Sequence, residues 1–285
     1  MDRRTGKVER RTDSRHWLAR WRDALSLPLA HRHFDVVGDV HGCLDELLLL
    51  LADLGYCVDR RRENFAVTPP RRRTLVFVGD LVDRGPAAPE VLRLAMAMTR
   101  AGTALCVAGN RDEAMARAMK GRADHVSRGM ERTLNQLAKQ PKEFRAEVLS
   151  FLRRLPSHLM LDEGRLAVTH AGLKEATKGR GSAVARVFAL RGDLTAKRGP
   201  FDLPLHKIWT ARYRGRALVV HGHTPVLKPV WHNNTVNIDT GCVYGGHLTA
   251  LRYPERETLS IPAMDIYYEP RRPFAPNCTL RKKRK

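Results

Sequence analysis

The chain has 285 residues, 43% of them hydrophobic, which is enough for a sizeable core in one large domain or two small ones. Its formal net charge is +21, and much of it lies at the ends: residues 1–33 carry +5 and residues 271–285 carry +7. The five cysteines are scattered without a CxxC pair, which argues against a disulfide framework and a zinc ribbon.

The chain begins with a basic N-terminal extension, residues 1–33. Trp17, Leu18, Trp21 and Leu25 share one face of a predicted short helix over residues 15–25. The favoured interpretation is that this helix docks on the core. Binding to a membrane surface is the alternative. The segment lacks the apolar region of a signal peptide.

From Phe34 onward, six short apolar runs each end in a cluster of polar residues. They are "FDVVGDVHG", "TLVFVGDLVDRG", "ALCVAGNRDE", "RLAVTHAGL", "ALVVHGHTP" and "NTVNIDTG". Their β-branched and apolar content predicts buried strands. Residues 43–55 and 88–102 have apolar positions at helical spacing and end near glycine, so helices are expected between the first three strands.

Alternation of strand, polar loop and helix predicts an α/β sheet whose polar clusters share the edge formed by the carboxyl ends of the strands. We expect the main domain to span residues 34–262, with a charged helical insertion over about 111–160. Residues 263–285 are predicted to form a basic C-terminal tail. The longest leucine-rich run, residues 47–55, is too short to cross a bilayer, so no transmembrane segment and a cytoplasmic location are expected.

The polar residues at these strand ends are aspartates, histidines and one asparagine, namely Asp39, His41, Asp80, Asn110, His170, His221 and His223. Mixed oxygen and imidazole donors suit divalent ions such as Mn²⁺, Fe²⁺ or Zn²⁺, with Mg²⁺ as a further alternative. Each residue alone is more often structural than functional. Their recurrence after five strands predicts a site for two metal ions, an arrangement that clamps the oxygens of a phosphoryl displacement.

The segments "GDVHG", "GDLVDRGP", "GNRDE", "THAGL" and "GHTPV" closely resemble the calcineurin-like metallophosphoesterases. The likeness covers about residues 34–250. It is strongest to the branch of bacterial and phage serine/threonine protein phosphatases and diadenosine-tetraphosphatase-type enzymes. The resemblance implies a four-layer αββα sandwich and hydrolysis of phosphate monoesters or phosphoanhydrides by metal-activated water.

The resemblance also implies six metal ligands in two groups that share one bridging residue. Asp39 and His41 are expected to hold the first ion, Asp80 both ions, and Asn110, His170 and His223 the second, with Mn²⁺ favoured. His221 does not match the ligand position of "GHT", and a strand residue or a supporting partner is expected there.

Two arginines are implied in phosphate binding. Arg84, in "VDRG", matches a phosphate-binding position, and a guanidinium forms bidentate bonds to phosphate oxygens. Arg212, in "IWTARYRGR", is a second candidate, although its spacing from the tryptophan is one residue longer than usual. The implied reaction is one direct displacement without a covalent phospho-enzyme.

The chain departs from the protein-phosphatase pattern at Arg111. The usual "GNHE" histidine, oriented by the aspartate that corresponds to Asp83, protonates the leaving oxygen; an arginine holds its proton too firmly to do so. Arg111 therefore binds phosphate or leaving-group charge in an active enzyme, or His125 or Glu113 donates the proton. In the third alternative, the protein is a degenerate phosphatase that binds a phosphorylated or nucleic-acid partner.

The first alternative is favoured, because losing one general acid costs only about 10²–10⁴ in rate and all six ligands are present. "GNRD" also resembles the corresponding segment of UDP-diacylglucosamine pyrophosphatases. Weakly basic leaving groups, such as phosphoanhydrides and phenolates, then fit best. The expected partners are a phosphorylated protein or a nucleotide, with non-specific nucleic-acid contact through the basic ends.

Overall fold

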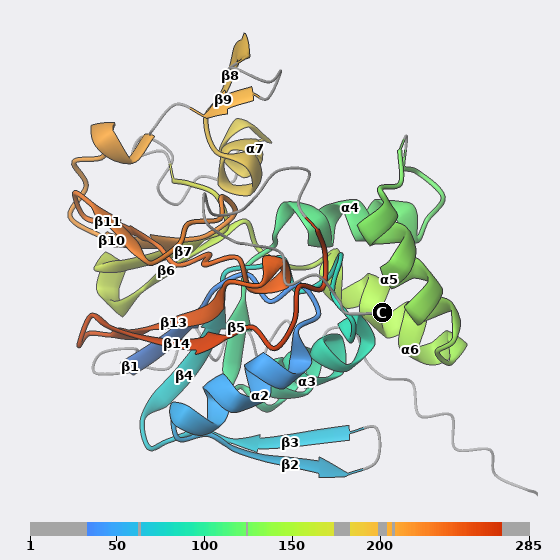
Figure 1. The fold of residues 1–285 in the computed structure, drawn as a ribbon. Helices are drawn as coiled ribbons and strands as arrows, with labels where there is room; N and C mark the ends of the chain where they lie inside the picture. Colours follow the sequence, from blue (N-terminus) through green and yellow to red (C-terminus); the bar gives the residue numbers. More distant parts are fainter. Residues whose placement is uncertain are drawn as a thin grey trace, which may run out of the picture.

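Two five-stranded β-sheets packed face to face form the centre of the computed structural model (Figure 1). The structure describes residues 33–61, 64–123, 125–173, 183–198, 204–206 and 209–269. The helix predicted over residues 15–25 and residues 270–285 of the predicted tail lie outside this part of the chain. The predicted nucleic-acid contact through the basic ends therefore stays a prediction.

The first sheet has the strand order β14-β13-β1-β4-β5. Its central strands β1, β4 and β5 are parallel, while β13 pairs antiparallel with β1 and β14 antiparallel with β13. The bounds of these strands are β1 His33–Val37, β4 Arg73–Phe77, β5 Ala104–Cys106, β13 His247–Tyr253 and β14 Glu257–Pro262. The carboxyl ends of the parallel strands therefore meet at one edge.

The second sheet has the order β11-β12-β10-β7-β6. Strands β7, β10 and β12 are parallel, and the outer strands β6 and β11 pair antiparallel with their neighbours. The bounds are β6 His158–Leu161, β7 Leu166–Thr169, β10 Leu218–His221, β11 Val230–His232 and β12 Thr235–Asn237. All six apolar runs identified in the sequence thus form strands of these two sheets.

Helices cover the outer faces of both sheets, which gives four layers. Phe34, Val76 and Val220 belong to the cluster of buried side chains between the sheets. On the other face of the first sheet, helices α2 (Leu44–Asp53) and α3 (Ala88–Ala101) pack against it, and α7 (Ala183–Arg191) lies outside the second sheet (Figure 1). Strands buried on both faces explain the nearly continuous apolar runs. The predicted α/β class with an αββα arrangement is confirmed.

Three further helices follow β5 and pack beside the first sheet: α4 Asn110–Ala118, α5 Arg128–Ala138 and α6 Lys142–Leu152. They fall within the predicted insertion. Ser127 caps the N-terminus of α5, and its hydroxyl accepts a hydrogen bond from the backbone N–H of Met130. Two hairpins lie outside the two large sheets, β2 (Cys57–Arg61) with β3 (Asn64–Thr68) and β8 (Leu194–Arg198) with β9 (Pro204–His206).

The first residues of the predicted C-terminal tail are packed on the domain. Met264 N–H and the Tyr267 hydroxyl both donate to Oε1 of buried Glu46, each at 2.8 Å. Tyr268 N–H donates to the carbonyl oxygen of Val243 at 3.0 Å. The chain therefore stays in contact with the domain through residue 268, beyond the predicted boundary at 262.

No helix in the described ranges is long and apolar enough to cross a membrane. The cysteines in these ranges, Cys43, Cys57, Cys106 and Cys242, are free thiols. This agrees with the absence of a disulfide framework expected from their spacing.

Candidate active site

The loops that follow the parallel strands of both sheets approach one another closely because glycines precede the functional side chains. A Cβ atom at Gly109 would lie 2.1 Å from Oδ1 of Asp80, and one at Gly222 would lie 2.0 Å from Oδ1 of Asp39. Any other residue at these two positions would push the loops apart. The glycines of "GN" and "GH" thus set the distance between the ends of different strands.

Asp39, His41 and Asp80 form the first group of the site. Their ligand atoms lie within 4.8 Å of one another, and all three side chains are buried. His41 donates its Nδ1 proton to the carbonyl oxygen of Val82 at 2.8 Å, which leaves Nε2 with a lone pair 3.6 Å from Oδ2 of Asp80. A histidine ligand is oriented in this way by a backbone carbonyl in many metal sites.

Asn110, His170 and His223 form the second group. Oδ1 of Asn110 lies 2.9 Å from Nε2 of His170 and 3.0 Å from Nδ1 of His223, and the two nitrogens are 3.0 Å apart. The Nδ1 atom of His170 is 3.2 Å from the carbonyl oxygen of Val78, so donation there leaves Nε2 as a lone-pair donor. Three ligand-type atoms therefore converge on one small volume.

Asp80 lies at the junction of the two groups. Its Oδ2 faces His41 at 3.6 Å, and its Oδ1 is 3.5 Å from Nε2 of His170. A second link comes from Asp39, whose carboxylate accepts the backbone N–H of His223 at 3.3 Å. The structure thus brings all six sequence-predicted residues together, in the two sets expected from the sequence.

Several residues of the site have a backbone conformation that is costly for any residue except glycine. The φ angles are 47° at His41, 49° at Asp80, 79° at Asp83, 74° at Arg84 and 75° at His223. Each left-handed residue costs about 1–2 kcal/mol. Such strain is concentrated at functional sites, where the surrounding packing maintains it.

The electrostatics of the site favour a bound cation. Burial, followed by repulsion from Asp239 and Asp80, raises the pKa of Asp39, and burial raises the pKa of Asp239 to about 7. Burial lowers the pKa of His41 and of His170 to about 3, so both imidazoles are neutral at pH 7. A bound cation would relieve the repulsion that raises the carboxyl pKa values, and the neutral imidazoles have a lone pair for it.

Asp239 was not singled out in the sequence, although it lies in the run "NTVNIDTG". It follows β12 and is 3% exposed, and its Oδ1 accepts the N–H of Gly241 at 3.1 Å. The signal was the same as for Asp39 and Asp80, an aspartate directly after an apolar strand. It is a third buried carboxylate beside the two groups.

The donor set fits divalent first-row metals. Oxygen atoms come from two aspartates and one asparagine, nitrogen atoms come from three imidazoles, and no thiolate belongs to either group. Mn²⁺, Fe²⁺ and Zn²⁺ bind such mixed oxygen and nitrogen sets, and Mg²⁺ prefers the oxygen atoms.

Arg84 reaches into the first group. Its side chain is 13% exposed, and Nη1 donates to Nε2 of His41 at 2.9 Å. The Arg84 Cζ atom lies 5.3 Å from the ring centroid of Tyr244 and 5.8 Å from that of Tyr268, within the range of cation–π attraction. Two aromatic rings that the sequence did not indicate therefore hold the arginine that the resemblance assigns to phosphate.

Asp83 lies between two guanidinium groups. Its Oδ2 is 3.4 Å from Nε of Arg111 and 3.7 Å from Nε of Arg84, and the side chain is fully buried. Burial raises the pKa of Asp83, and both arginines oppose that shift. In the protein phosphatases that the sequence resembles, the corresponding aspartate orients a histidine; here the residue beside Asp83 is Arg111, a guanidinium.

Asp112 fixes the loop that carries Asn110 and Arg111. Its Oδ1 accepts the backbone N–H of Leu81 at 3.0 Å, and its Oδ2 accepts that of Gly109 at 2.9 Å. The fully buried carboxylate thereby ties the loop after β5 to the loop after β4. This role, too, becomes visible only in the structure.

The remaining sequence candidates lie apart from the two groups. Glu113 accepts hydrogen bonds from Arg186 of α7, at 3.1 Å from Nε and 3.0 Å from Nη2, and is therefore committed to an ion pair. His125 is exposed in a separate cavity, and Arg212 is exposed at the end of the 3-10 helix Trp209–Arg212. His221 is buried with its ring 5.2 Å from that of Trp209, as expected for a strand residue.

Residues 32–253 match the calcineurin-like phosphoesterase family. The bis(5'-nucleosyl)-tetraphosphatase PrpE (asymmetrical) of Anoxybacillus flavithermus is 41% identical over 246 residues, covering 85% of this chain and 99% of the relative. The protein of the same name from Bacillus subtilis is 38% identical over 242 residues, covering 84% and 98%. The chain therefore belongs to the calcineurin-like phosphoesterase family.

Solved structures agree with this assignment. The crystal structure of a candidate diadenosine tetraphosphatase superposes with a TM-score of 0.61 at 26% identity, over 84% of this chain and 97% of the other. A yeast serine/threonine phosphatase, at 15% identity and a TM-score of 0.55, shares the fold over 85% of this chain and 83% of its own. The protein is a metal-dependent phosphoric ester hydrolase.

Proposed function

We propose that this enzyme hydrolyses dinucleoside tetraphosphates asymmetrically, to a nucleoside monophosphate and a nucleoside triphosphate. One observation carries the choice of substrate: Asp83 and Arg111 form an ion pair where the resemblance implies a proton-donating histidine. Because a guanidinium does not give up its proton, a leaving group that needs no protonation fits best. A nucleoside phosphate is such a group, whereas the alkoxide of serine is not.

The six clustered side chains are our proposed metal ligands. Two ions would be held by Asp39 and His41 on one side, by Asn110, His170 and His223 on the other, and by Asp80 between them; we favour Mn²⁺. When bound, such ions lower the pKa of water and neutralise phosphate oxygens.

The protein groups have separate tasks in the displacement. Arg84, held between Tyr244 and Tyr268, binds oxygens of the transferred phosphoryl group with its guanidinium. Arg111 neutralises charge on the departing phosphate, and Asp83 fixes the orientation of both arginines. We keep Arg212 as a second phosphate ligand, supported by its place after Trp209. The free thiols support a reducing, cytoplasmic location.

A comparison of substrates tests this proposal. With Mn²⁺ present, we expect kcat/KM for diadenosine tetraphosphate to exceed that for a phosphoserine peptide and for a cyclic nucleotide. Anion-exchange chromatography should show AMP and ATP in equal amounts from diadenosine tetraphosphate. Formation of two ADP molecules, or faster hydrolysis of the phosphopeptide, would contradict the proposed substrate.

The substitution Arg111→His tests whether the residue at position 111 sets the preference for the leaving group. A histidine beside Asp83 can donate a proton, so hydrolysis of the phosphoserine peptide should rise relative to diadenosine tetraphosphate. We expect the ratio of the two kcat/KM values to shift by about tenfold or more, since general acids contribute about 10²–10⁴. Arg111→Gln, which removes the charge without adding an acid, is the control. An unchanged ratio in Arg111→His would show that this position does not set leaving-group preference.

A further inference from the structure

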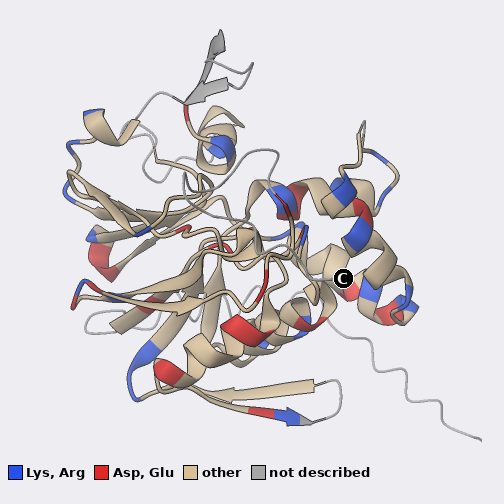
Figure 2. Ribbon diagram, in the orientation of Figure 1, with Lys and Arg blue, Asp and Glu red and all other residues tan. Residues whose placement is uncertain are grey.

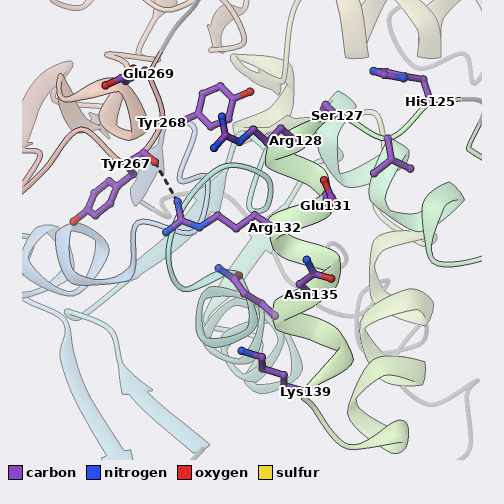
Figure 3. Close-up of a pocket in the computed structure, with 12 residues that line it drawn as sticks. His125, Ser127, Arg128, Glu131, Arg132, Asn135, Lys139, Tyr267, Tyr268 and Glu269 are labelled. Atoms are coloured by element: carbon purple, nitrogen blue, oxygen red, sulfur yellow. Dashed lines mark hydrogen bonds between the residues drawn. The ribbon is translucent and has the colours of Figure 1, made fainter.

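A cavity of about 1200 Å³ lies between helix α5 and residues 267–269 (Figure 3). Arg128 and Arg132 of α5 and Lys139, directly after the helix, line one side, and Tyr267 and Tyr268 line the other. Small-molecule pockets usually measure about 300–1,000 Å³, so this volume accommodates a nucleotide with several phosphates. We refer to it as the α5 cavity.

The α5 cavity adjoins the arginine to which we assign the transferred phosphoryl group. Nη1 of Arg132 donates to the carbonyl oxygens of Arg84, at 3.0 Å, and of Tyr267, at 3.1 Å. Tyr268 lines the cavity, and its ring centroid is also 5.8 Å from Cζ of Arg84. The same side chains thus form the wall of the cavity and support the active site.

The lining combines the groups that nucleotides require. Arg128 and Lys139 are exposed cations, and both line the cavity together with the ring of Tyr268 (Figure 3). Glu131 and Glu269 also line the cavity, so its charge is mixed, as it is along α4–α6 in general (Figure 2). The lining carries three cations, Arg128, Arg132 and Lys139, against these two carboxylates. A ligand with phosphates at one end and a neutral base at the other suits this distribution.

We propose that the α5 cavity binds the nucleoside phosphate portion of the substrate that extends beyond the bond to be broken. Arg128 contacts its phosphates, and the ring of Tyr268 stacks on its base, an interaction that tolerates any base. This inference rests on the proposed dinucleoside tetraphosphatase function. The proposal also gives a role to the packing of residues 263–268 on the domain, because this packing places Tyr268 at the cavity.

Arg128→Ala provides the first test. We expect the ratio of kcat/KM for diadenosine tetraphosphate to that for p-nitrophenyl phosphate to fall about tenfold, the scale of one charge-assisted hydrogen bond. Arg145→Ala, an exposed arginine of α6 outside the cavity, should leave both values unchanged. Equal losses for both substrates in Arg128→Ala, or no loss for either, would overturn the proposal.

The pair Tyr268→Leu and Tyr268→Phe tests the stacking. Phenylalanine keeps the ring and should retain the substrate ratio, whereas leucine should lower it. If both variants behave alike, the base does not stack on residue 268.

Binding of β,γ-methylene-ATP to the Mn²⁺-loaded enzyme separates this inference from the proposed function. Calorimetry should show about tenfold weaker binding to Arg128→Ala than to the wild type or to Arg145→Ala. If the wild type hydrolyses p-nitrophenyl phosphate but not diadenosine tetraphosphate, the proposed function fails. Weaker binding to Arg128→Ala then still supports a nucleotide site in the cavity, and equal binding overturns it.

Discussion

Asp80→Asn is expected to lower kcat for both diadenosine tetraphosphate and p-nitrophenyl phosphate by about 10³-fold or more. Asp80 is the residue whose two carboxylate oxygens face different groups of the site, His41 at 3.6 Å and His170 at 3.5 Å. An amide in its place offers one neutral oxygen and a nitrogen that cannot bind a cation. Loss of several kcal/mol of metal-derived stabilisation corresponds to a factor of this size, because each 1.36 kcal/mol is tenfold.

The fold should survive this substitution. Asparagine keeps an oxygen that can accept the backbone N–H of Arg111, which now donates to Oδ1 of Asp80 at 2.8 Å. It also removes one of the buried carboxylates that repel each other. Thermal unfolding should therefore show an intact cooperative transition. Asp53→Asn, an exposed residue at the end of α2, is the matched control. Activity of Asp80→Asn near the wild-type level would show that Asp80 does not join two metal ions.

The strands and the site residues at their ends were predictable from the sequence because their signals are local. An apolar run followed by glycine and a ligand-type residue marks both a buried strand and the end that carries the candidate site. Gly109 and Gly222 show why the pattern is strict, since a Cβ at either position would collide with an aspartate of another loop.

Features that depend on packing between distant segments were not predictable. Residues 263–268 were predicted to begin a basic tail, yet Tyr267 and Met264 bind Glu46, more than two hundred positions earlier. Nothing local marks Tyr268 as a neighbour of Arg84. Asp239 had a local signal, but its repulsion of Asp39 appears only when the two sheets are packed together.

Position 111 was predictable in part: the residue type is visible in the sequence, but its contacts depend on packing. The sequence identified Arg111 as a departure from a histidine that, in the resembling phosphatases, is oriented by the aspartate at the position of Asp83. The structure adds that Asp83 also contacts Arg84, so that one buried carboxylate holds two guanidiniums. An arginine at position 111 is thus accommodated by an ion pair with Asp83, and the six proposed ligands still lie together.

Removal of metal is expected to abolish activity and to destabilise the protein. After treatment with EDTA, hydrolysis of both substrates should fall by about 10³-fold or more, for the reason given for Asp80→Asn. Without cations, Asp39, Asp80 and Asp239 repel one another, and Arg84 offsets only part of this repulsion. A ligand at about 100 times its Kd stabilises the fold by about 2.7 kcal/mol, so the Tm should drop measurably on stripping and recover with Mn²⁺. An unchanged Tm and full activity in EDTA would argue against a metal centre.

The most direct measurement is the number of ions that the stripped protein takes up. We expect equilibrium dialysis against Mn²⁺, followed by elemental analysis, to give two ions per wild-type chain. Asp80→Asn should retain at most one, and activity should return only as the second site fills. A fully active wild-type enzyme with a single ion, or two ions retained by Asp80→Asn, would contradict a two-metal centre joined by Asp80.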